Sequence, residues 1–277
     1  MRRWLRWLAT LVPLVLFAPF AAGQLCTVSF VPLTFGNYVG VLLTGVNHAT
    51  VNCLTAYTLG LNAGLGAGAT TTTRQMTGPG GAELSYKLFQ DAARTINWGN
   101  TPGVDTFTGT GSLSAQTINI YSQVAAGQLV APGTYTDTIS SASASFTVTA
   151  VVPATCTVSA STLSFGNYSG ALIDAASALT VTCTNLTTFN IGLSAGTATG
   201  ATVTTRKMTS PALATLAYVL FRDSARTVNW GNTVGTDTLI SQGTGAPVQY
   251  GVFGRLTAGQ SANPAVYTDT IIATVTY

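Results

Sequence analysis

Charged side chains are scarce in this 277-residue chain: Asp, Glu, Lys and Arg make up 7% of it, whereas hydrophobic residues make up 47%. Soluble domains ordinarily carry about 25% charged residues, so uncharged polar and small residues must form most of the surface. Low charge combined with high hydrophobicity excludes a disordered chain. It also argues against nucleic-acid binding, because neutralising phosphates requires clustered Lys and Arg.

Side chains suited to catalysis are equally few. The only histidine is His48, and the eight acidic residues are scattered along the chain. A Ser-His-Asp arrangement, a facing pair of carboxylates and a phosphate-binding glycine loop all lack a recognisable pattern here. We therefore predict a protein that is not an enzyme and that has no catalytic residues, no metal site and no cofactor.

Long hydrophobic runs are also missing. The longest, Leu8 to Phe20, has about 13 residues, whereas a membrane-spanning helix needs roughly 20. Three arginines precede this run and the small residues Ala21, Ala22 and Gly23 follow it, which is typical of a secretory signal. We predict cleavage after residue 23 and export. Cleavage would leave 11 − 3 = 8 basic and 8 acidic residues, a net charge of zero.

What the sequence does contain is a tandem duplication. Several motifs occur twice, first 130 and then 132 residues apart, so the second copy carries one insertion of two residues between Cys183 and Gly192. Each copy has about 125 residues, enough for a hydrophobic core of its own. The matching motifs are CTVS (26–29 and 156–159), FGNY (35–38 and 165–168), TRQM or TRKM (73–76 and 205–208), and DAARTINWGN or DSARTVNWGN (91–100 and 223–232).

Short segments of alternating apolar and polar residues, bounded by Gly, Pro and Asn, indicate β-strands in both copies. No convincing amphipathic helix is present. The pattern predicts an all-β protein made of two antiparallel β-sandwiches in series. The clearest alternating positions are Leu84, Tyr86 and Leu88, then Ile118, Ile120 and Val124, and finally Ile271, Ala273, Val275 and Tyr277.

The four cysteines follow the duplication. Cys26 and Cys53 are 27 residues apart, as are Cys156 and Cys183. Four cysteines allow three pairings, and the duplication favours one disulfide within each copy, in the oxidising environment of an exported protein. A zinc site is the alternative, but close cysteine pairs and additional histidines are lacking.

The block RTINWGN at 94–100 and its twin RTVNWGN at 226–232 allow two interpretations. Trp98 and Trp230 could stack on a ligand, or they could pack over the edge of a sandwich beside a tight turn at Gly99 and Gly231. Because both copies keep the block although their roles should differ, we favour the structural interpretation.

Together these motifs resemble the spore coat protein U domain. The resemblance rests on CTVS, LxFGNY (33–38 and 163–168), TRxM, YxLFxDxxRTxNWGN, AGQ and a terminal YTDTIxxTVTY, in this order. It covers residues 24–277 in two copies. The family includes subunits of archaic chaperone–usher pili of Gram-negative bacteria. It implies immunoglobulin-like sandwiches that lack their last strand, which a periplasmic chaperone and then the N-terminal extension of an adjacent pilin subunit supply.

The two copies differ in the segment before their first cysteine. Residues 146–152 alternate like the donor extension of family pilins, whereas only Gln24 and Leu25 of the expected mature chain precede Cys26. We expect a signal peptide at 1–23, an N-terminal adhesin domain at 24–145 and a C-terminal pilin domain at 146–277. Residues 146–152 could complete either domain. A subunit that accepts a strand but donates none would belong at the fibre tip.

The resemblance therefore predicts a tip adhesin that is exported through the periplasm to the cell surface and mediates attachment or biofilm formation. Its expected partners are a periplasmic chaperone, an outer-membrane usher and an adjacent pilin. Two alternatives stay open: a carbohydrate- or lipid-binding module that uses Trp98 or Trp230, and a coat protein without fibre assembly.

Two groups of site residues follow from this prediction. Ile271, Ala273, Val275 and Tyr277 are expected at the chaperone and donor-strand interface. Apolar residues of the first copy are expected in adhesive loops, although Leu172 and Ile173 match Leu42 and Leu43 in the second copy and favour core positions for these two. The candidates are Val41, Leu42, Leu43, Leu65, Phe107, Leu129 and Val130.

Overall fold

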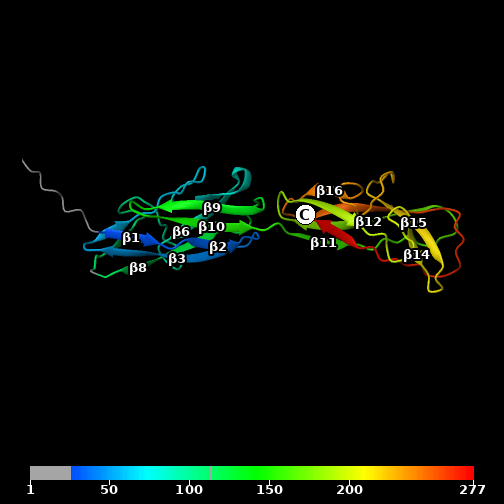
Figure 1. Cartoon of the computed structure of the whole chain (residues 1–277), viewed down its shortest axis with the longest axis horizontal. Helices are drawn as coiled ribbons and strands as arrows, with labels where there is room; N and C mark the ends of the chain where they lie inside the picture. The colour runs from blue at the N-terminus through cyan, green and yellow to red at the C-terminus, as the bar shows by residue number, and fades with distance from the viewer. Residues whose placement is uncertain (1–25, 113) are drawn as a thin grey trace, which may run out of the picture.

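The computed structural model describes residues 26–112 and 114–277, so the predicted signal peptide lies outside the described residues. Two β-rich domains lie end to end and are joined by a short connection (Figure 1). The all-β prediction is confirmed, since the only helical element among the described residues is a single 3-10 turn at Pro79–Gly81. In that part of the chain, no helix has both the length and the apolar character needed to cross a membrane.

The first domain winds one hydrogen-bonded sheet around its core, in the order β1-β3-β8-β6-β5-β9-β10-β2, and adds the pair β4-β7. Its strands are short and separated by Gly, Pro and Asn, as the sequence predicts. They are β1 (Cys26–Phe30), β2 (Leu33–Asn37), β3 (Leu43–Cys53), β4 (Tyr57–Leu59), β5 (Arg74–Thr77), β6 (Glu83–Phe89), β7 (Phe107–Gly109), β8 (Gln116–Val124), β9 (Gly133–Ser140) and β10 (Ser145–Val152).

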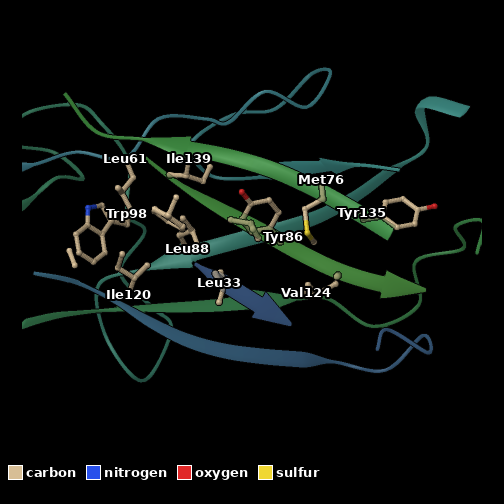
Figure 2. Packing of buried hydrophobic residues seen from close by; sticks show 14 of the residues in the cluster. Leu33, Leu61, Met76, Tyr86, Leu88, Trp98, Ile120, Val124, Tyr135 and Ile139 are labelled. Atoms are coloured by element: carbon tan, nitrogen blue, oxygen red, sulfur yellow. The ribbon is translucent and has the colours of Figure 1, made fainter. Parts of the chain in front are cut away.

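Alternation along these strands builds the core. Leu84, Tyr86 and Leu88 of β6 are buried, and the residues between them are more exposed, as expected for a strand with one face against the core. Figure 2 shows this core stretching from Trp98 at one end to Tyr135 at the other. Both side chains are fully buried, so the core runs the length of the domain.

The second domain repeats the sandwich with two separate sheets, β11-β12-β17-β15-β14 and β16-β13-β18. Its core contains the twins of first-domain core residues, including Trp230 and Tyr218. Its strands are β11 (Cys156–Ala160), β12 (Ile173–Cys183), β13 (Thr188–Leu193), β14 (Arg206–Thr209), β15 (Thr215–Phe221), β16 (Leu239–Gln242), β17 (Val248–Leu256) and β18 (Ala273–Thr276).

The disulfide prediction is confirmed. Cys26 bonds to Cys53 and Cys156 bonds to Cys183, so each domain has its own bridge. In each case the two cysteines face each other across an antiparallel pair, β1 with β3 and β11 with β12. Closing a loop of this length stabilises a domain by roughly 3 kcal/mol in the chain-entropy model.

The boundary between the domains differs from the sequence-based one. Residues 146–152 were expected to begin the C-terminal domain at 146–277, but they form β10, which pairs with β9 and β2 of the first domain. The alternating apolar side chains of this segment are buried in the first core. The connection between the domains therefore lies between Val152 and Cys156, and the N-terminal domain extends beyond residue 145.

Candidate functional site: an open strand position in the second domain

Strand β10 is the last strand of the first domain and fills a gap between β9 and β2. It pairs antiparallel with β9 along its whole length and parallel with β2, with Val148 opposite Leu33. Its inward side chains are at most 4% exposed: Phe146, Val148, Ala150 and Val152. The strand thus inserts a row of alternating apolar side chains into the core while its backbone joins two edges.

The same position is open in the second domain. Residues 163–167 are the twins of β2 and 265–272 are the twins of β9, but neither segment forms a strand. Among the described residues no strand lies between them. A cleft of about 450 Å³ opens there instead. Apolar side chains dominate its lining: Leu163, Phe165, Leu179, Leu193, Met208, Tyr218, Leu220, Val252, Tyr267, Ile271 and Ala273.

Burial of the twin residues shows what the missing strand does. In the first domain the residues around β10 are sealed from solvent; Met76, Tyr135 and Ile139 are each 0% exposed. Their twins Met208, Tyr267 and Ile271 are only partly buried, although they pack against the second core. The second domain therefore has the same core side chains, but no strand of the described residues covers them, and the cleft is a hydrophobic groove.

An aspartate marks the edge of this groove, at the position where the first domain has a buried one. In the first domain the Asp137 carboxylate accepts hydrogen bonds from the Tyr86 hydroxyl at 2.7 Å and the Leu65 amide at 2.7 Å. In the second, Asp269 accepts from the Tyr218 hydroxyl at 2.8 Å and lines the cleft. Burial and the neighbouring Asp269 raise the pKa of Tyr218, so this tyrosine stays protonated and donates to the acid.

The arginine of each TRxM motif is a buried cross-link. Arg74 is 0% exposed and donates to the carbonyl oxygens of Leu61, Asn62, Thr71 and Trp98 at 2.7–3.0 Å. Arg206 makes the equivalent set of four bonds in the second domain. Burial lowers the pKa of Arg74 to about 10, which leaves it charged at neutral pH. Backbone carbonyls, rather than a carboxylate in direct contact, satisfy this buried cation.

The structural interpretation of the tryptophan motif is confirmed. Trp98 and Trp230 are both 0% exposed, and their indole N–H groups donate to the carbonyl oxygens of Leu59 and Ile191. Neither ring is accessible to a ligand, so the carbohydrate- or lipid-binding alternative loses its expected residues. The turn itself differs from the prediction. The left-handed residue is Arg94 (φ 58°), whereas Gly99 is needed because a Cβ there would collide with the Asp105 carboxylate.

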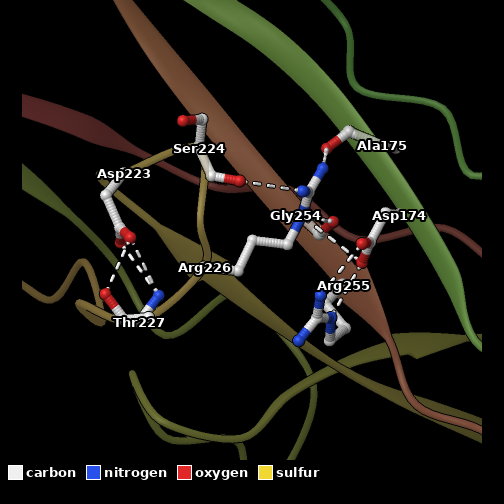
Figure 3. Close-up of polar contacts among 8 residues, drawn as sticks. All are labelled: Asp174, Ala175, Asp223, Ser224, Arg226, Thr227, Gly254 and Arg255. Carbon is white, nitrogen blue, oxygen red and sulfur yellow. Dashed lines mark hydrogen bonds and ion pairs between the residues drawn. The ribbon is translucent and has the colours of Figure 1, made fainter.

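One group of charges belongs to the second domain alone. Asp174 of β12 accepts from Arg255 of β17 at 2.8 Å and lies 3.3 Å from the Arg226 guanidinium (Figure 3). Thr44 and Gln123 face each other at the equivalent positions of the first domain. The hydrogen bond from Arg255 lowers the pKa of Asp174. Because the carboxylate is one-third exposed, this surface cluster adds little stability.

The residues expected at the strand interface divide into two pairs. Ile271 and Ala273 line the groove, next to Leu163 and Met208. Val275 lies in β18 opposite Ile191 of β13 and packs against the second core, and Tyr277 is exposed beyond the strand. Ile271 and Ala273 thus belong to the groove, whereas Val275 and Tyr277 lie outside its lining.

The residues expected in adhesive loops do not form one surface. Val41, Leu42, Leu65 and Leu129 are each more than half exposed, whereas Leu43, Phe107 and Val130 pack against the first core. Leu43 begins β3, and Phe107 begins β7, where its ring contacts those of Tyr57 and Trp98. For these three, core packing replaces the expected exposure.

The exposed candidates lie in two separate places. The Gly127 amide donates to the Gly40 carbonyl oxygen, which places the loops containing Leu42 and Leu129 side by side. They lie at the domain junction, where the Asn185 side chain donates to the Leu129 carbonyl oxygen at 3.4 Å. Leu65 lies on a separate loop, tied to Asp137 by its backbone amide.

Most of the groove was not predicted from the sequence. Phe165, Met208, Tyr218 and Tyr267 line it, yet each reads as an ordinary core position of a duplicated sandwich. The signal that could have revealed them is the alternating segment 146–152, because the core residues that surround it in the first domain have twins in the second. Knowing which strands β10 contacts was needed to convert that signal into a list of residues.

Fold and groove define a tandem β-sandwich protein in which the position of β10 is filled in the first domain and is an apolar groove in the second. The chain belongs to the Spore Coat Protein U domain family, whose model matches residues 14–141 and again 142–274. Protein U of Myxococcus xanthus is 37% identical over 129 residues, which cover 42% of this chain and 72% of that protein.

The chain is also similar to two solved structures of bacterial proteins. One is from the CsuC–CsuE chaperone–tip adhesion subunit complex of the archaic chaperone-usher Csu pili of Acinetobacter baumannii, with a TM-score of 0.48 and 14% identity over 91% of this chain and all of that one. The other is the CupB6 tip adhesin of Pseudomonas aeruginosa, with a TM-score of 0.43 and 12% identity over 91% of this chain and 94% of that one.

Proposed function

We propose that this protein is an exported adhesive subunit of an archaic chaperone–usher pilus and that its second domain accepts a strand from another polypeptide. One observation carries the proposal: the two domains share a fold, yet the position that β10 fills in the first is an apolar groove in the second. A groove of this kind exposes strand edges and core side chains, which favours aggregation unless another chain covers it.

The groove suits an extended donor with alternating apolar residues. In the first domain the equivalent position is filled by the buried side chains of β10, which are Phe146, Val148, Ala150 and Val152. A donor should therefore carry apolar side chains at every second residue. Main-chain pairing with two edges would provide affinity, and the alternate side chains would provide specificity. A periplasmic chaperone would supply such a strand first and an adjacent pilin subunit would replace it after passage through the usher.

The use of β10 supports a position at the fibre tip. Residues 146–152 are the segment that most resembles a donor extension, and the first domain uses them for its own core. They are therefore not free to complete a neighbouring subunit. A subunit that accepts a strand through its second domain while its donor-like segment is buried in the first would end a fibre.

Co-production of the full chain with an archaic-class periplasmic chaperone tests the proposal. We expect a 1:1 complex in which the chaperone protects the second domain, and aggregation or proteolysis of that domain without the chaperone. A variant with Ile271→Asp, which puts a charge into the groove, should lose the complex, whereas Ile272→Asp, at an exposed neighbouring position, should retain it. A stable monomer that ignores the chaperone would contradict the proposal.

Adhesion is the second part of the proposal. Val41 and Leu42, near the domain junction, and Leu65, on a separate loop, are exposed apolar residues of the first domain, and burying either group against a hydrophobic surface would gain about 25 cal/mol per Å². Attachment of cells to polystyrene should fall when Leu65→Asp or the pair Val41→Asp and Leu42→Asp is introduced. Val104→Asp, at an equally exposed position, is the control. Equal attachment by all variants would exclude these residues from the adhesive surface.

A further inference from the structure

Strand β4 of the first domain has an open edge. It pairs with β7 on one side, as Thr58 faces Thr108. On its other side no strand of the described residues is paired with it. A cleft of about 560 Å³ runs along this open edge, at the end of the domain that carries the Cys26–Cys53 disulfide. This cleft is distinct from the groove of the second domain.

The second domain shows what such an edge can bind. Its strand β13 is the twin of the β4 region, and it pairs with β16 on one side and with β18 on the other. Strand β18, with the sequence ATVT, runs antiparallel to β13, and Val275 faces Ile191. It also contacts β11, the twin of β1. The position that β18 fills in the second domain is the cleft in the first.

A turn explains the difference between the domains. In both, an amide at the end of the β4 or β13 region donates to the chain opposite: Asn62 to the Ser140 carbonyl oxygen, and Ser194 to that of Ile272. Beyond this point the second domain continues directly into β18. In the first domain, residues 141–144 turn back instead, with the Ser141 amide donating to the Ala144 carbonyl oxygen, and lead into β10. The edge of β4 is left uncovered.

The backbone of β4 presents hydrogen-bonding groups to the cleft. Within a strand, the amide and carbonyl groups of successive residues point to opposite sides. The Leu61 amide donates to the Gly99 carbonyl oxygen on the β7 side and the Asn62 amide to Ser140 on the other. By alternation the backbone groups of Thr58 and Gly60 also point to the open side. Their twins Asn190 and Gly192 face β18 in the second domain.

The lining of the cleft defines the chemistry of a partner. It consists of apolar and small uncharged side chains, including Val28, Tyr57 and Leu59 beside the disulfide, and it contains no charged residue. In β18 the inward residues Ala273 and Val275 are short, and the outward Thr274 and Thr276 are exposed. A matching partner is an uncharged extended peptide with short apolar side chains at every second position.

We propose that the open edge of β4 is a peptide-binding site, at which an extended, uncharged segment of a partner protein adds as an antiparallel strand. The site lies in the first domain, away from the groove that accepts the donor strand, and it gives that domain a protein ligand in addition to a hydrophobic surface. Main-chain pairing with Thr58 and Gly60 would provide the affinity, and the apolar lining would select short side chains.

Titration of the purified full-length protein with a fluorescent peptide tests this site. The probe is the sequence of residues 272–277, IATVTY, and its control is IAPVTY, in which proline removes one backbone donor. Two variants address the site: Thr58→Pro, on the exposed side of the edge strand, and Ala142→Trp, which fills the cleft from an exposed turn. Ala142→Ser is the matched control.

We expect the probe to bind wild type and Ala142→Ser alike. The proline in IAPVTY or in Thr58→Pro should weaken binding by about tenfold or more, the effect of one unmade buried hydrogen bond. Ala142→Trp should weaken binding at least as much, because its side chain occupies the cleft. If Thr58→Pro fails to fold, Ala142→Trp decides. Binding that both variants leave unchanged would place the peptide on the second domain, in exchange with β18, and would overturn the inference, as would no binding to wild type. Neither result affects the chaperone complex.

Discussion

Replacing residues 273–277 with a copy of residues 141–152 should close the second domain with its own strand. Ile272 is the twin of Ser140, so the copied turn and strand would continue the chain as β9 continues into β10 in the first domain. The copy of β10 would lie between residues 163–167 and 265–272 and would cover the groove. We therefore expect the second domain to become a stable closed sandwich that needs no chaperone.

A matched chimera isolates the contribution of the side chains. It carries the same insertion with serine in place of the copied Phe146 and Val148, which are 4% and 0% exposed in the first domain. Burying a Phe or Val side chain stabilises by about 1.5–3 kcal/mol each, so the two chimeras should differ by about 3–6 kcal/mol. For a domain of this size that corresponds to a difference on the order of 10–20 °C in Tm.

Differential scanning calorimetry gives the comparison directly, because the first domain is unchanged and serves as an internal reference. We expect two transitions in the original chain and in the serine chimera, and an upward shift of the lower one in the chimera with the native copy. Equal transition temperatures in the two chimeras would refute the reasoning, since they would show that the groove does not accept the apolar row of β10.

Further predictions concern the features that both domains share and one that they do not. Arg74→Met should destabilise the first domain by about 3 kcal/mol or more in urea unfolding, because four carbonyl oxygens lose their buried donor; Arg74→Lys should restore little, and an unchanged midpoint would contradict this role. Reducing the disulfides should cost roughly 3 kcal/mol per domain, measured by thermal unfolding with and without reductant; equal unfolding temperatures would refute it. The pKa of Asp174 is lowered in the folded state, so its ion pair stabilises the fold above the unfolded pKa, and this stability is lost as the pH falls through the folded pKa. Asp174→Asn should therefore remove a small loss of unfolding free energy in acid, below about 1 kcal/mol. A larger effect at neutral pH would show that the cluster is structural.

The features that sequence alone predicts are those that repetition or alternation encodes. The duplication defined two sandwiches and paired Cys26 with Cys53, and the alternation of Leu84, Tyr86 and Leu88 located a central strand. A structural role for Trp98 followed from its presence in both copies. These inferences depend on local pattern, which survives without knowledge of how the strands are ordered.

The site depends on non-local pairing, which sequence pattern leaves open. Residues 146–152 have an equally good alternation whether they join the first domain or the second, and only their pairing with β9 and β2 decides it. Likewise Phe107 among Thr and Gly and Leu65 among Gly and Ala are both isolated apolar residues, yet Phe107 packs on Trp98 and Leu65 is exposed. Which residues line the groove follows from the position of β10 in the first domain, to which no strand corresponds in the described part of the second.

Hydrogen exchange measured on the full-length protein, with the first domain as the internal standard, tests the central claim most directly. The amides of residues 265–272 should exchange much faster than those of their twins in β9 (Gly133–Ser140), because β10 pairs with β9 and no described strand covers the second segment. Addition of a synthetic peptide SFTVTAVV, the sequence of residues 145–152, should slow the exchange at 265–272 and leave β9 unchanged. Equal protection of the two segments before any peptide is added would mean that both sandwiches are closed, which would contradict the account.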